Sequence, residues 1–118
     1  MVLIKDNHIA AAGGITTAVS RVRAAAPAHL PIEVEVKNLS ELAEVLPLNV
    51  NRIMLDNMSL AEMKEAVAMV NGRCQLEASG NVTLQTVAAI AATGVDYISS
   101  GALTHSVTAL DISLNLDE

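Results

Sequence analysis

Short apolar runs, each ending in a polar or glycine-containing tip, recur along this chain of 118 residues. There are six, the last less clear than the others: residues 2–6, 32–36, 52–57, 75–80, 97–101 and 111–116. Helical patterns lie between most of them, and strands that alternate with helices are typical of a parallel α/β sheet. The tips should therefore gather at the carboxyl ends of the strands, where such sheets bind their ligands.

Helix signals between the runs are specific. Ser59 with Glu62, and Asn38 with Glu41, form capping-box patterns at which a helix begins. Pro27, Asn71-Gly72 and Gly94 are stop signals at the ends of helical patterns. The sequence predicts four helices, over residues 15–26, 38–46, 59–70 and 82–93.

Alternation along the strands separates polar from apolar side chains. With a period of two, one face carries charged and polar groups and the opposite face is apolar. The polar face holds Leu3, Lys5, Glu33, Glu35, Met54, Asp56, Glu77 and Ser79; the apolar face holds Ile4, Val34, Val36, Ile53 and Leu55. A sheet covered by helices on both faces would bury that charge, whereas a barrel places it at the mouth of the lumen. The pattern favours an α/β barrel.

The length of the chain limits how much of a barrel it can form. An eight-stranded barrel takes roughly 200 residues or more, and this chain supplies five or six strands. We therefore expect residues 1–118 to form one domain, the C-terminal part of an α/β-barrel catalytic domain, with about half of the barrel present. Its open strand edge should favour association.

Composition narrows the class of protein. The chain is 52% apolar with a net charge of −6, and it has no Lys/Arg cluster, so nucleic acid and acidic membrane surfaces are not expected partners. No apolar run approaches the roughly 18 residues of a membrane span, and the sequence predicts a cytoplasmic protein. The single cysteine, Cys74, precedes a predicted buried strand and is expected to be a small core residue.

Three charged residues at strand ends are candidates for chemistry. Lys5 could neutralise nearby carboxylates, anchor a phosphate or carboxylate, or form a Schiff base. Glu35 and Asp56, 21 residues apart, are expected at equivalent heights on adjacent strands. There they could bind a metal, hydrogen-bond to sugar hydroxyls or stabilise a developing cation. Glu33 and Glu77 lie a layer deeper, where buried hydrogen bonds or ion pairs are expected.

Two glycine turns form a second candidate site. Ser79-Gly80-Asn81 and Ser100-Gly101-Ala102 each follow a strand and precede a predicted helix start, and their glycines are 21 residues apart. The last two strand loops of a barrel commonly form a phosphate site. His8, just after Lys5, is expected to be a loop histidine with a structural hydrogen bond.

These blocks together resemble the quinolinate phosphoribosyltransferase family. The resemblance covers nearly the whole chain, from about residue 2 to residue 116. It is carried by LIKDNH (3–8), VEV (34–36), MLDN (54–57), EASGNV (77–82), GVD (94–96), IS (98–99), GALT (101–104) and LDIS (110–113).

The resemblance implies an α/β barrel that joins quinolinate to phosphoribosyl pyrophosphate with Mg²⁺, releasing pyrophosphate and carbon dioxide, in a homo-oligomer. Lys5 looks like the lysine that contacts substrate, and Glu35 and Asp56 like the carboxylates around the ribose and its magnesium. The two turns look like the ribose-5-phosphate site, with Asn81 where the family usually has glycine. The family's N-terminal sandwich, its first barrel strands and the cations that grip quinolinate have no counterpart here. The chain alone is therefore expected to be inactive.

Three other interpretations remain open at this point. The first is a relative with another substrate, such as a nicotinate phosphoribosyltransferase or the homologue associated with molybdenum transport. The second is an aldolase that uses Lys5 as a Schiff base, which the lack of a second lysine or tyrosine near the site disfavours. The third is a non-catalytic fragment that contributes only structure.

Overall fold

Five parallel strands form a single sheet in the order β1-β2-β3-β4-β5. The computed structural model describes residues 1–104 and residue 112. The strands are β1 (Val2–Ile4), β2 (Ile32–Val36), β3 (Arg52–Asp56), β4 (Gln75–Ser79) and β5 (Tyr97–Ser99). All five begin where the sequence predicts them. The sixth predicted strand, 111–116, lies outside the described residues except for Ile112.

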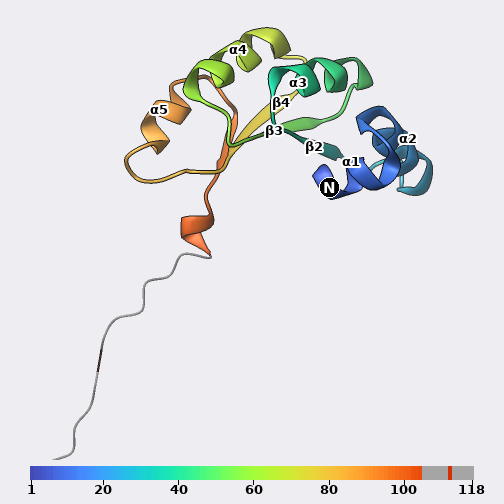
Figure 1. The fold of residues 1–118 in the computed structure, drawn as a ribbon, viewed down its shortest axis with the longest axis horizontal. Coiled ribbons are helices and arrows are strands. Elements are labelled where there is room, and N and C mark those ends of the chain that lie inside the picture. Colours follow the sequence, from blue (N-terminus) through green and yellow to red (C-terminus); the bar gives the residue numbers. More distant parts are fainter. Residues whose placement is uncertain (105–111, 113–118) are drawn as a thin grey trace, which may run out of the picture.

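The helices lie on one side of this sheet (Figure 1). They are α1 (Asp6–Ala12), α2 (Ile15–Ala25), α3 (Leu39–Val45), α4 (Leu60–Val70) and α5 (Val87–Ala91), with 3₁₀ turns η1 (Leu46–Leu48) and η2 (Gly101–Leu103). In the described part of the chain, the opposite face of the sheet carries no α-helix. Among these residues, no helix has the length and apolar character needed to cross a membrane. One covered face and one open face is the arrangement of a partial barrel, as predicted.

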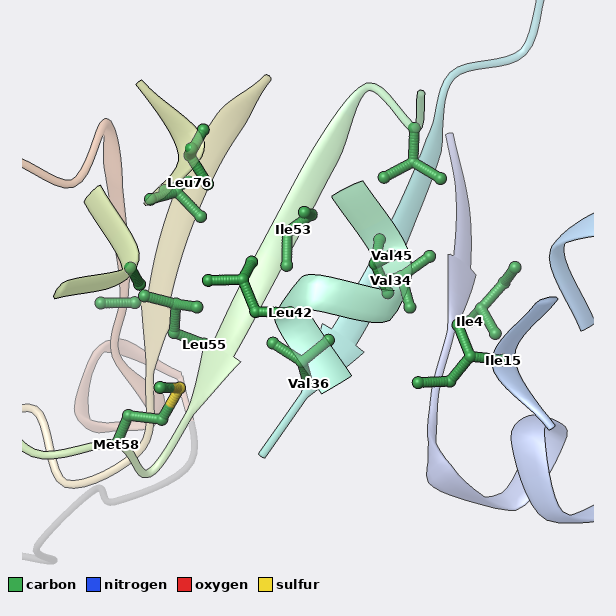
Figure 2. Packing of buried hydrophobic residues seen from close by; sticks show 14 of the residues in the cluster. Ile4, Ile15, Val34, Val36, Leu42, Val45, Ile53, Leu55, Met58 and Leu76 are labelled. Carbon is green, nitrogen blue, oxygen red and sulfur yellow. The ribbon is translucent and has the colours of Figure 1, made fainter. Parts of the chain in front are cut away.

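The core fills the space between the sheet and its helices. Figure 2 shows Val34 and Val36 of β2 and Ile53 of β3 gathered around Leu42 of α3. All four side chains are fully buried. This is the face that alternation predicts to be apolar. Cys74, just before β4, is half-buried against the same core, and its burial raises the pKa of the thiol.

Capping explains where two helices begin. At α4, the Ser59 side chain accepts from the Glu62 backbone N–H and the Glu62 carboxylate accepts from the Ser59 backbone N–H, so the predicted capping box forms. At α3, the Asn38 side chain accepts from the Glu41 N–H as predicted. The Glu41 carboxylate instead accepts from the backbone N–H of Lys37, at 2.8 Å. Only half of the second predicted box is therefore present.

Two helices differ from the prediction. Helix α1 was not predicted, and only its residue His8 was expected, in a loop; the helix has seven residues, and its apolar Ile9 and Ala12 are only partly buried against the core. His8 lies in this helix, where its Nδ1 accepts from the Lys5 backbone N–H at 3.0 Å. The helix predicted over 82–93 is only five residues long, since Thr83 and Thr86 accept from each other's backbone N–H and form a turn first.

The placement of α3 over the sheet predicts a large difference between two leucine substitutions. Leu42→Ala should lower the free energy of unfolding by about 2–5 kcal/mol, because it removes a buried side chain and leaves a cavity. Leu84→Ala, at a side chain that is 90% exposed, should change it by less than about 0.5 kcal/mol. Urea denaturation of both variants measures the difference, and equal effects would contradict the packing described here.

Candidate active site

The open face of the sheet carries its polar side chains in rows that follow the strand register. One row, near the carboxyl ends of the strands, contains Asp56, Ser79 and Ser99. The row beneath it contains Glu35, Met54, Glu77 and Tyr97. The charged face that alternation predicts is therefore the face left without helices, and the candidate residues share it.

Lys5 and Glu35 are brought together at the end of β1. The Lys5 Nζ lies 3.6 Å from the Glu35 Oε2. The Glu35 side chain is 10% exposed, whereas the Lys5 side chain is 48% exposed. Lys5 thus neutralises a nearly buried carboxylate, one of the roles considered for it, while its ammonium group stays accessible from the open face.

Asp56 does not lie level with Glu35, and the prediction of equivalent heights was wrong. In the register, Glu35 pairs with Met54, so Asp56 lies two residues, or about 6.6 Å, further along its strand. Equal sequence spacing does not fix register, because the packing of the intervening helix sets the stagger that barrel strands require. Both carboxylates still face the same side. The Asp56 Oδ1 accepts from the side chain of Asn57 at 3.0 Å.

A second lysine lies at the same edge, contrary to the argument made from sequence. The Lys37 Nζ donates to the Asp6 Oδ2 at 2.8 Å. This hydrogen bond raises the pKa of Lys37, with smaller contributions from Glu35 and Asp56, and it lowers the pKa of Asp6. A protonated amine is a poor nucleophile, so Lys37 does not support Schiff-base chemistry. Continuing the period of two from Glu35 would have placed Lys37 on this face.

Glu33 lies a layer deeper than Glu35, as predicted, whereas Glu77 lies level with Glu35 through Met54, so its predicted depth was wrong. The Glu77 Oε2 lies 3.0 Å from the Arg52 Nη1, and its Oε1 accepts from Ser99, so the predicted buried ion pair is confirmed for Glu77. Glu33 is 2% exposed, and its Oε1 has no hydrogen-bond partner among the described residues. Burial, followed by the charge of Glu77, raises the pKa of Glu33 to about 7.

The two glycine turns meet in one cleft of about 530 Å³. Its lining comprises Ser79, Gly80, Asn81, Val82, Thr83, Ser99, Gly101 and Ala102. The structure therefore brings together every predicted residue of the two turns except Ser100, whose hydroxyl donates to the Val82 carbonyl at 3.3 Å. Ser99 takes its place in the cleft. Alternation from Tyr97 would have identified Ser99, because both face the open side.

Backbone conformation explains the residues of the first turn. Gly80 has a φ of +87°, and a Cβ at this position would lie 2.2 Å from the Asn57 Oδ1. Asn81 follows with a φ of +52°, a left-handed conformation that asparagine tolerates. Neither turn leads directly into an α-helix: α5 begins only at Val87, and Gly101 begins the single 3₁₀ turn η2. The expected helix starts were wrong there, which leaves the N–H groups of the turns themselves as anion donors.

Two carboxylates at the mouth fit a magnesium ion that arrives with a substrate. Mg²⁺ is commonly held by one or two carboxylates together with substrate phosphates and water. Glu35 and Asp56 offer two carboxylates on one face. Within residues 1–104 and 112, no group of three or more His, Cys, Asp or Glu side chains is arranged to hold a metal. A magnesium ion shared by Glu35, Asp56 and a substrate therefore stays a prediction.

Fold and site together define a class of protein: part of an α/β barrel with charged residues and a two-turn cleft at the carboxyl ends of its strands. Residues 1–115 match the family model described as quinolinate phosphoribosyl transferase, C-terminal domain. The chain belongs to this family.

Individual relatives of the chain carry the names of enzymes of this family. The chain is 51% identical to a chloroplastic nicotinate-nucleotide pyrophosphorylase (carboxylating) of Oryza sativa subsp. japonica, over 99% of this chain and 36% of the relative. It is 49% identical to quinolinate phosphoribosyltransferase (decarboxylating) 1b of Nicotiana tabacum, over 99% of this chain and 39% of the relative. It thus spans less than half the length of these curated relatives.

Solved structures show the same fold. The nicotinate-nucleotide pyrophosphorylase of Ehrlichia chaffeensis superposes with a TM-score of 0.85 at 51% identity, over 89% of this chain and 38% of that one. A copper homeostasis protein of Streptococcus agalactiae, at 19% identity and a TM-score of 0.60, shares the fold only.

The buried Glu33 predicts a pH dependence of stability. Its pKa is about 7 in the folded state, against an ordinary value of 4.5. The folded chain therefore holds a proton that the unfolded chain releases, and the contribution of Glu33 to stability is lost as pH rises from about 4.5 to about 7. Glu33→Gln, which mimics the protonated form, should remove this loss.

Urea denaturation between pH 4.5 and pH 8 measures the effect as the difference between variant and parent. The free energy of unfolding of Glu33→Gln should rise relative to the parent as pH increases. The control Glu65→Gln, at an exposed position of α4, should follow the parent curve. A Glu33→Gln curve parallel to that of the parent would show that folding does not raise the pKa of Glu33.

Proposed function

We propose that the protein to which this chain belongs transfers the phosphoribosyl group of phosphoribosyl pyrophosphate to quinolinate. Decarboxylation then gives nicotinate mononucleotide, a step of NAD biosynthesis. The observation that carries the proposal is the common face of Lys5, Glu35, Asp56 and the two-turn cleft, in a chain that belongs to the quinolinate phosphoribosyl transferase family. The names of the relatives support quinolinate over another substrate.

Each part of the site has a role in this reaction. The backbone N–H groups of the turns at Gly80 and Gly101 bind the 5-phosphate of the ribose. Glu35 and Asp56 face the ribose ring, and Lys5 contacts substrate as an accessible cation beside Glu35. The net charge of −6 is compatible with a phosphorylated ligand, because backbone donors need no excess of lysine or arginine.

The chemistry requires stabilisation of positive charge. The bond from C1 of the ribose to pyrophosphate breaks with its electron pair on the leaving oxygen, and C1 acquires oxocarbenium character. The ring nitrogen of quinolinate then bonds to C1. Its positive charge draws the electron pair of the adjacent carbon–carboxylate bond into the ring, carbon dioxide leaves, and the ring carbon takes up a proton. Glu35 and Asp56 stabilise the cation electrostatically.

Magnesium fits this scheme as a partner of the substrate. When held by Glu35, Asp56 and the substrate's phosphates, Mg²⁺ would neutralise the charge of the leaving pyrophosphate. The carboxylates themselves orient the ribose. A homo-oligomer and a cytoplasmic location stay predictions for the whole protein, since some relatives are named as chloroplastic or mitochondrial.

A chimera tests the proposal. The 118 residues would replace the matched segment of the Ehrlichia chaffeensis relative, and quinolinate-dependent release of pyrophosphate would be measured. In this background, Glu35→Gln and Asp56→Asn should each lower kcat by about two to three orders of magnitude, the usual loss for one transition-state contact. The affinity for quinolinate should change far less, because the carboxylates act mainly on the transition state.

The control in the chimera is Glu65→Gln, which should retain full activity. The isolated 118-residue chain should show no turnover. A folded chimera without activity would favour the interpretation of a purely structural fragment, and unchanged kcat in both carboxylate variants would contradict the roles of Glu35 and Asp56.

A further inference from the structure

Ser99 lies where the buried polar side chains of the open face meet the cleft. It is level with Ser79 across the β4–β5 pair, and it lines the cleft between the two glycine turns. Its hydroxyl donates to the Glu77 Oε1. A serine hydroxyl has one proton and two lone pairs. With the proton directed to Glu77, the Ser99 oxygen can only accept a hydrogen bond from a ligand.

Contacts beneath Ser99 hold Glu77 in place. The other carboxylate oxygen of Glu77 lies 3.0 Å from the Arg52 Nη1. Arg52 also donates from Nε and Nη2 to the Gln75 Oε1, at 3.4 and 3.2 Å, and its guanidinium lies 3.9 Å from the centre of the Tyr97 ring. The Arg52 and Glu77 side chains are mostly buried. Since the planar guanidinium is fixed on three sides, Glu77 is held toward Ser99.

Because the Ser99 oxygen can only accept, a ligand group beside it must be a hydrogen-bond donor. An unprotonated phosphate oxygen offers no proton and is disfavoured beside another oxygen, whereas a sugar hydroxyl can donate. We propose that Ser99 accepts a hydrogen bond from a hydroxyl group of the bound sugar phosphate, with Glu77 and Arg52 as positioning residues that hold it in this role. The inference rests on the proposed function, because it takes the ligand of the cleft to be a sugar phosphate.

Two ligands and one substitution test the role of Ser99. Ribose 5-phosphate and inorganic phosphate would be titrated into the 118-residue chain while the backbone amide signals of Gly80 and Gly101 are followed by NMR. Ser99→Ala should weaken the binding of ribose 5-phosphate about fivefold, the usual effect of one hydrogen bond. Ser99→Ala should leave the affinity for inorganic phosphate unchanged. The control is Ser40→Ala, at an exposed position of α3, which should alter neither affinity.

A double-mutant cycle tests the role of Glu77. Glu77→Gln should weaken the binding of ribose 5-phosphate by a similar factor in the parent chain. In the Ser99→Ala background it should have no further effect on this binding. A purely structural role would give additive losses. If Glu77→Gln does not fold, the Ser99→Ala comparison still decides, because it removes a single oxygen atom.

The outcomes separate this inference from the proposed function. Equal losses for both ligands, no loss for either, or additive effects in the cycle would overturn the inference and leave the phosphate cleft in place. Amide signals of Gly80 and Gly101 that respond to neither ligand in the parent chain would overturn the cleft itself, and with it the proposed function and the inference.

Discussion

Burial of one face of the sheet beneath α3 and α4 is the interaction on which the rest of the structure depends. Val34, Val36, Ile53 and Leu55 are fully buried there. Because side chains alternate along a strand, each apolar residue committed to the helices turns its neighbours to the open face. The position of the charged residues is therefore a consequence of core packing, and a shift of one residue in register would move them all into the core.

The charged side chains buried on the open face lose their contact with water, and only some of them are paired in return. Buried charges are tolerated when they are paired, and the Arg52–Glu77 ion pair satisfies this condition at 3.0 Å. Glu33 does not, and its raised pKa is the result. The paired part of this layer lies directly beneath the two-turn cleft. The Arg52–Glu77 ion pair thus fixes the layer on which the residues nearer the strand ends lie. In the cleft itself, Gly80 packs closely against the Asn57 side chain.

Sequence reasoning predicted the five described strands, the division of the two faces and the meeting of the two turns, because alternation and glycine placement are local properties. It failed where long-range packing decides. The stagger between Glu35 and Asp56 depends on how the helix between their strands packs, which a count of 21 residues does not contain. Helix α1 contains no fully buried residue, and its short apolar contact through Ile9 and Ala12 was too weak a signal to predict it. Ser100 was predicted to line the cleft, but Ser99 does so. Extending the alternation from Tyr97 by two residues would have identified Ser99.

The central claim is that the two turns form one phosphate site on the open face. A crystal structure of the chain with ribose 5-phosphate tests it most directly. We predict the phosphate group within hydrogen-bond distance, about 2.7–3.2 Å, of backbone N–H groups from both the Gly80 turn and the Gly101 turn, with the ribose directed toward Asp56. A phosphate bound by only one of the turns, or bound on the helix-covered side, would contradict the account.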